Sequence, residues 1–155
     1  MTTEHLQAST KAFFDAFAAS TQPVKMLSFF STSSPVILQH APIECPHPQT
    51  SRLDGSNAIR SYFDILATHW TRSDVKLRHA PEIDAENHRV VVPASVVWKW
   101  RRSGRQFKEV FTWTLEFDDN MKITSFVVKT ISGTCVMRAT DNPNTESSQL
   151  THASL

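Results

Sequence analysis

The sequence has little glycine and cysteine, and these absences exclude several kinds of site. With three Gly among 155 residues, it contains no glycine-rich loop of the kind that surrounds phosphate groups. The G-x-S-x-G pattern of a serine nucleophile on a strand–helix turn is absent too. The two cysteines, Cys45 and Cys135, form no C-x-x-C pair, which favours a reduced intracellular setting. A disulfide between them stays open.

Long apolar runs and an excess of charge are missing as well. No segment approaches the ~18 continuous apolar residues of a membrane span, and the polar start MTTEHLQAST does not resemble a signal peptide. We therefore expect a cytoplasmic protein with no membrane partner. The formal net charge is +1, so attraction of the whole surface to nucleic acid is not expected. The basic segment WKWRRSGRQFK is better explained as a solvated hairpin tip than as a nucleic-acid contact.

The sequence is rich in apolar aromatic residues, with ten Phe and four Trp against one Tyr. Apolar residues recur at helical spacing in residues 6–17 and 59–70, and a short helix is expected over 21–30. Alternation with period two predicts strands at 35–40, 74–83, 88–100, 106–117 and 123–132. This order predicts an α+β cone, with N-terminal helices packed on a curved, mostly antiparallel sheet.

The predicted domain covers residues 4–137, and the polar residues 138–155 are typical of a disordered tail. Pro93 lies inside the long strand 88–100 and predicts a bulge or bend there, because proline cannot donate to a ladder. The outer face of the sheet is expected to be apolar and to form a homodimer interface. Its candidate residues are Val91, Val97, Val110 and Val128.

Three segments, VILQHAP, LDGSNAIRSYF and FDDNMKI, carry a resemblance to a known family. Their order and spacing resemble the nuclear transport factor 2-like superfamily, and its SnoaL-like polyketide cyclase and ketosteroid isomerase branches in particular. The most recognisable part is G-x-x-A-I-R-x-Y-F, which begins at Gly55 and ends at Phe63. The resemblance implies a conical cavity between helices and sheet, which in this superfamily serves isomerases, dehydratases, cyclases, hydrolases and non-catalytic modules.

The resemblance also suggests a catalytic base. The ketosteroid isomerase branch has an aspartate at the end of the strand before the loop, and His40 takes that position in VILQHAP. A neutral imidazole can perform the same proton transfer. The branch's two acid donors have no equivalent, because the first helix offers Phe where they have Tyr and the later strand offers Trp113. Steroid isomerisation by that mechanism is therefore not implied.

His40 is the predicted base, with Asp15 or a backbone carbonyl orienting its second ring nitrogen; otherwise it is a strand-end histidine bonded to the loop. The partner acid is His79 or Glu109. His79 alternates with Val75 and Leu77, which predicts that it faces inward; the alternative, which the pattern favours somewhat more, is a half-buried structural histidine near the end of the sheet. Glu109 faces the cavity only if its strand is in that register; a slip of one residue would turn it to solvent.

The apolar and aromatic residues around this cavity form the predicted ligand-binding set, and a structural core is the alternative for each of them. The set is Phe14, Phe17, Tyr62, Phe63, Trp98, Phe111 and Trp113. No metal site is predicted, because His40, Cys45 and His47 do not have a recognised ligand spacing.

The sequence therefore supports two hypotheses. The first is an acid/base enzyme without a cofactor, of the isomerase, cyclase or dehydratase type, acting on a small hydrophobic polyketide- or terpenoid-like molecule. The second is a non-catalytic ligand-binding or homodimerisation module of the same fold. An enzyme requires His40 and a second titratable group to converge on one cavity.

Overall fold

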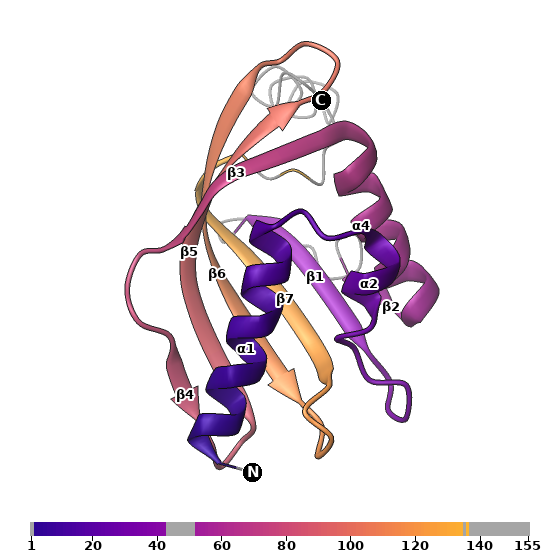
Figure 1. The fold of residues 1–155 in the computed structure, drawn as a ribbon, viewed down its shortest axis with the longest axis vertical. Helices are drawn as coiled ribbons and strands as arrows, with labels where there is room; N and C mark the ends of the chain where they lie inside the picture. The colour runs from indigo at the N-terminus through magenta and orange to yellow at the C-terminus, as the bar shows by residue number, and fades with distance from the viewer. Residues whose placement is uncertain (1, 43–51, 135, 137–155) are drawn as a thin grey trace, which may run out of the picture.

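The computed structural model describes residues 2–42, 52–134 and 136, which form a curved sheet with helices on its concave side (Figure 1). The helices are α1 (Thr3–Ala18), α2 (Pro23–Leu27) and α4 (Ser56–His69). The strands are β1 (Ile37–Pro42), β2 (Arg52–Asp54), β3 (Trp70–Leu77), β4 (Glu82–Asp84), β5 (Arg89–Trp100), β6 (Gln106–Phe117) and β7 (Ile123–Gly133). Both cysteines and the segment 138–155 lie outside the described residues, so their pairing and the predicted tail stay untested.

The sheet has the strand order β2-β1-β7-β6-β5-β3, and the short β4 also pairs with β5. The β1–β7 pair is parallel, and the other pairs are antiparallel. The predicted α+β architecture is confirmed. The structure has two strands where one was predicted at 74–83. The first, β3, begins at Trp70 directly after α4 and ends at Leu77, and the second, β4, begins at Glu82.

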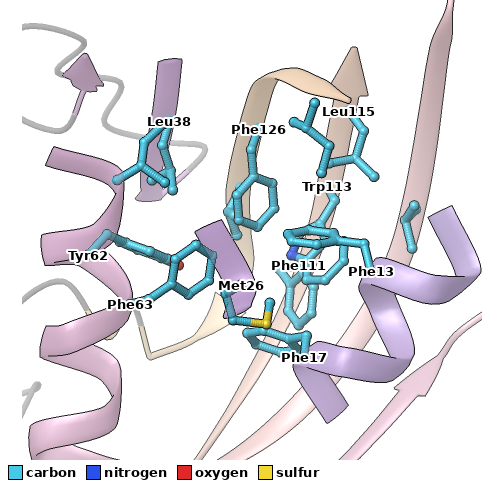
Figure 2. Close-up of a cluster of buried hydrophobic side chains, with 14 of the residues drawn as sticks. Phe13, Phe17, Met26, Leu38, Tyr62, Phe63, Phe111, Trp113, Leu115 and Phe126 are labelled. Carbon is cyan, nitrogen blue, oxygen red and sulfur yellow. The ribbon is translucent and has the colours of Figure 1, made fainter. Parts of the chain in front are cut away.

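The helices form where apolar residues recur on one face. The buried residues of α1 are Leu6, Thr10, Phe13 and Phe17, and those of α4 are Ile59, Tyr62, Phe63 and Leu66. Figure 2 shows Tyr62 and Phe63 of α4 on one side and Phe13 and Phe17 of α1 on the other, with Trp113 and Phe126 between the two helices. The Phe13 ring lies 5.2 Å from both the Trp113 and Phe126 rings, in tilted and edge-to-face geometries that aromatic pairs favour.

Alternation along the central strands sets which side chains face the helices. Buried residues occupy even positions at Val92, Ala94 and Val96 in β5 and odd positions at Phe111 and Trp113 in β6. In β7 the buried positions include Phe126, Val128 and Thr130, so Val128 faces inward. The prediction that Val128 belongs to the outer face is therefore wrong. Its neighbour Val127 takes that place, beside the half-buried Val91, Val97 and Val110.

Pro93 does not produce the predicted bulge. The pairing of β5 with β6 passes through Pro93 opposite Thr112 without a shift. On its other side, β3 ends opposite Ala94 and β4 begins opposite Val91. The Pro93 carbonyl accepts from the Arg78 N–H at 2.9 Å at this junction. Proline has no N–H to donate, and at Pro93 no ladder hydrogen bond is lost, because neither β3 nor β4 pairs with this residue.

The irregularity is in β3 instead. Ser73 lies opposite Val97 and Lys76 opposite Ser95, so three steps along β3 match two along β5. Asp74 within this bulge has a φ of 51°. Arg72, which precedes the bulge, lies opposite Trp98 and so shares its inward face. No helix in the described part of the chain is long and apolar enough to cross a membrane.

Candidate functional site

A buried hydrogen-bond network joins three elements on the inner wall of the cone. His40, near the end of β1, has its Nδ1 atom 2.8 Å from the hydroxyl of Tyr62 on α4 and its Nε2 atom 2.7 Å from Oε2 of Glu109 on β6. The exposed fractions of the three residues are 2%, 1% and 1%. Polar groups at this depth require hydrogen-bond partners, and here they find one another.

Glu109 accepts further hydrogen bonds that hold its carboxylate in place. The Trp98 indole N–H donates to Oε1 at 2.9 Å, and the Thr130 hydroxyl donates to Oε2 at 2.5 Å. An ionised carboxylate only accepts hydrogen bonds, and the indole only donates. With Nε2–H of His40 as the third donor, the ionised form of Glu109 is well solvated by the protein itself.

This carboxylate determines which nitrogen of His40 carries the proton. Because Glu109 accepts at Nε2, the neutral ring has its hydrogen on Nε2 and a free electron pair on Nδ1. The Tyr62 hydroxyl then donates to Nδ1. The resulting chain, Tyr62 to His40 to Glu109, places a basic nitrogen next to a hydroxyl group, with a carboxylate behind both.

The surroundings of the network are aromatic and closely packed. Phe17, Trp98, Phe111, Trp113 and Val128 enclose His40, Tyr62 and Glu109, and the space that remains between them does not admit a water molecule. The Phe17 ring lies 5.2 Å from Trp113 and 6.0 Å from Trp98. A ligand can reach His40 only if side chains on one side of this enclosure move.

Arg72 lies on one such side. Its Nε–H donates to the carbonyl of Phe17 at 2.5 Å, and its guanidinium stands 4.3 Å from the centre of the Phe17 ring. Burial lowers the pKa of Arg72 to about 10, and interaction with Tyr62 offsets part of this shift. Arg72 also lines an open hollow of about 220 Å³, with Phe63 and Trp70 among its walls. Phe63, which lines this hollow, also packs against Tyr62, with ring centres 5.1 Å apart.

The structure brings together most of the predicted site residues. Glu109 is buried and bonds to His40, so β6 has the register in which Glu109 faces inward and not the one in which it faces solvent. Five of the seven predicted ligand-binding residues line the enclosure: Phe17, Tyr62, Trp98, Phe111 and Trp113. Phe63 packs behind Tyr62 at the edge of the Arg72 hollow. Phe14 lines a separate surface hollow with Leu77 and Pro81.

His79 is not part of this group. It lies in a bend after the end of β3, and its side chain is exposed. The expectation that it faces inward is wrong, because β3 ends two residues earlier at Leu77. Asp15 does not orient His40 either; it is exposed on α1 and pairs with Lys11 at 2.6 Å.

Two residues of the site, Arg72 and Thr130, were not predicted. Arg72 and Trp70 are two residues apart, an alternation that could have extended the predicted strand backward from residue 74. Thr130 alternates with Val128 and Phe126, but nothing in the sequence pairs it with Glu109. Among the described residues, no three His, Cys, Asp or Glu side chains gather as metal ligands would.

Comparisons with known proteins give structural but no sequence matches. No family model and no curated protein matches the chain. Among solved structures, a candidate polyketide cyclase from Xanthomonas campestris pv. campestris superposes with a TM-score of 0.63 at 15% identity, over 81% of this chain and 90% of that one. AusH from Aspergillus nidulans gives a TM-score of 0.67 at 18% identity, over 84% and 86% of the two chains.

A third similar structure is SalBIII, described as an epoxide hydrolase/cyclase-like enzyme in pyran ring formation in the polyether salinomycin. It gives a TM-score of 0.67 at 13% identity, over 82% of this chain and 91% of that one. These proteins have the SnoaL-like fold of the nuclear transport factor 2-like superfamily. The resemblance is confirmed for the fold, and at these identities it extends no further.

Proposed function

We propose that this protein is an acid/base enzyme of the isomerase, cyclase or dehydratase type, which acts without a cofactor on a small hydrophobic polyketide- or terpenoid-like molecule. The observation that carries the proposal is the buried Tyr62–His40–Glu109 chain, with its hydrogen bonds of 2.8 and 2.7 Å. Similarity in fold to proteins described as cyclases agrees with it.

The Tyr62 hydroxyl is the group that meets the substrate. When a substrate proton moves to the Tyr62 oxygen, the tyrosine's own proton moves to Nδ1 of His40. The ring becomes an imidazolium, and the Glu109 carboxylate at Nε2 stabilises its positive charge. Tyr62 stays neutral during this transfer, and the negative charge is left on the substrate.

The same chain works in the opposite direction. The imidazolium returns its proton through Tyr62 to a different atom of the substrate, such as an oxygen that leaves or opens from a ring. Removal at one atom and return at another is the proton balance of an isomerisation or a cyclisation. Glu109 touches His40 and not the substrate, so it is a positioning residue.

The alternative function is a non-catalytic binding or dimerisation module. The observation that favours it is the tight aromatic enclosure around His40, which leaves no room for a ligand without side-chain movement. In that case the network serves only to satisfy polar groups in the core.

The test is turnover in deuterated water with a panel of hydrophobic epoxides, enones and hydroxyketones. An enzyme that protonates a carbon atom places solvent deuterium on that carbon, where it does not exchange, and mass spectrometry detects it. We expect Tyr62→Phe and His40→Asn each to lower the rate by about 10²–10⁴-fold.

His5→Asn is the matched control, because His5 is an exposed histidine on α1. It should leave the rate unchanged. Circular dichroism and thermal unfolding of each variant separate lost chemistry from lost structure. Full activity in folded Tyr62→Phe and His40→Asn would overturn the acid/base assignment, and tight ligand binding without any turnover would favour the binding module.

A further inference from the structure

The hollow beside Arg72 has the properties of an anion-binding site. It holds about 220 Å³ and is lined by Arg72 and Arg101, by hydroxyl and amide side chains from the end of α1 to the start of α2, and by Phe63, Ala67 and Trp70. No acidic residue lines it. Two cationic groups therefore face a small hollow that has an apolar wall on one side.

The guanidinium of Arg72 has donors to spare. Its Nε–H is used by the Phe17 carbonyl. Within the described part of the chain, its two terminal nitrogens have no hydrogen-bond acceptor, no carboxylate pairs with it, and neither nitrogen is sealed from solvent. A largely buried cation without a counter-charge costs free energy that an anionic ligand would recover.

Other groups around the hollow fit the same kind of ligand. Arg101 uses its Nε–H on the carbonyl of Ala67 at 2.9 Å, and its side chain stays exposed at the rim. The buried indole N–H of Trp70 has no acceptor among the described residues. The two hydrogen bonds to the carbonyls of Phe17 and Ala67 fix the orientation of both guanidinium groups. The site is therefore preorganised, and ligand binding costs less conformational entropy.

We propose that the hollow between Arg72 and Arg101 binds the carboxylate of a small organic acid and directs the hydrocarbon part of that molecule toward Tyr62. The inference rests on the proposed function, since it names the substrate class of that site as an acid. A planar carboxylate matches the planar fork of a guanidinium, and Phe63 and Trp70 offer the adjoining apolar surface.

The test uses benzoate, the isosteric neutral benzamide, and inorganic phosphate, each titrated into the full chain. The readouts are the dissociation constant and the NMR signals of the Arg72 Nε–H and the Trp70 indole N–H. Benzoate should shift both signals and bind at least ~10-fold more tightly than benzamide, as is usual for a hydrogen-bonded charge. Equal binding of benzoate and benzamide would overturn the proposal, and so would tighter binding of phosphate.

Variants locate the effect. Arg72→Gln should abolish the preference for benzoate, and Arg72→Lys should keep part of it. Arg89→Gln removes the same charge at the far end of β5, where Arg89 pairs with Glu116, and should change nothing. If Arg72→Gln does not fold, the preference of Arg101→Gln for benzoate and the NMR signals of the wild type still test the proposal. A benzoate preference that survives in folded Arg72→Gln would rule Arg72 out.

One further variant separates this inference from the proposed function. Tyr62→Phe should bind benzoate like the wild type, although its turnover should be lost. If the protein binds benzoate and turns over no substrate, the proposed acid/base activity is refuted and the carboxylate site stands. If it turns over neutral substrates and shows no preference for benzoate, the carboxylate site is refuted and the acid/base activity stands.

Discussion

At the scale of single residues, Glu109 explains most of the arrangement around His40. Its exposed fraction is 1%, and an isolated carboxylate at that depth would be strongly unfavourable. Hydrogen bonds from His40, Trp98 and Thr130 compensate for the lost water. Trp98 can only donate, so Oε1 accepts, and in the ionised carboxylate Oε2 accepts as well, from Thr130 and from His40 Nε2–H.

We predict that Glu109→Gln reverses the tautomer of His40. An amide has one accepting oxygen, which Trp98 would take, and its NH₂ group would then face His40 Nε2. The ring would carry its proton on Nδ1 and could no longer accept from Tyr62. Nitrogen-15 NMR of the histidine ring measures this directly, and we expect turnover to fall by about 10²–10⁴-fold in the same variant.

Thr130→Val is the matched control for this prediction. It removes one donor to Glu109 and leaves the carboxylate and its bond to His40 in place. The tautomer should stay on Nε2, at a cost of about 1 kcal/mol in the free energy of unfolding. Retention of the Nε2–H tautomer in Glu109→Gln would show that the carboxylate does not orient the ring.

At the scale of secondary-structure elements, the site depends on a bulge where β6 and β7 pair. Phe111 lies opposite Thr130 and Val110 opposite Ser132, so Ile131 is an extra residue. The bulge places Gly133 opposite Glu109. Gly133 has a φ of +85°, and a Cβ atom there would stand 2.0 Å from the carbonyl oxygen of Lys108 and 3.3 Å from Cα of Glu109. The close approach of the two backbones therefore requires glycine.

We predict that Gly133→Ala destabilises the fold and displaces Glu109. The positive φ alone costs about 1–2 kcal/mol for an L-residue, and the contact with Lys108 adds to it. Gly104→Ala is the control, because Gly104 has a φ of +76° but meets only the side chain of Lys99, at 3.8 Å. Urea unfolding compares the two variants. Equal losses of stability would mean that β6 can move away from β7 at no cost.

At the scale of the whole molecule, the face of the sheet that points away from the helices carries half-buried valines. Val91, Val97, Val110 and Val127 lie on this face, with threonines between them, and Arg78 donates to the Thr112 hydroxyl there at 3.2 Å. Apolar side chains gathered on an exposed face are typical of an interface. A twofold pairing of this face with a second copy would bury the valines on both partners.

We predict that the protein is a homodimer through this face. Light scattering should give a mass twice the 17.5 kDa of the chain. Val110→Glu should produce the monomer, because the new charge would be buried between the partners without a counter-charge. Val24→Glu, on the exposed side of α2 with 52% exposure, should stay dimeric. A monomeric wild type would refute the interface.

The sequence by itself determined the kinds of element and much of what faces inward. Helical spacing in α1 and α4 and alternation in β6 depend on local geometry, so they could be read from the chain. The position of His40 at a strand end and the inward candidates Trp98, Phe111 and Trp113 came from the same patterns. The register of β6, and with it the direction of Glu109, stayed open because a shift by one residue exchanges the two faces.

Only the tertiary structure decided which side chains meet. His40 bonds to Tyr62, 22 residues along the chain, and to Glu109, 69 residues along it. The bulge in β3 ends the alternation that was expected to turn His79 inward, and Arg72 faces the core instead. Bulges and strand partners result from packing of the whole sheet against the helices, which no local pattern records. The chemistry of the site therefore lies in contacts between segments that are far apart in the sequence.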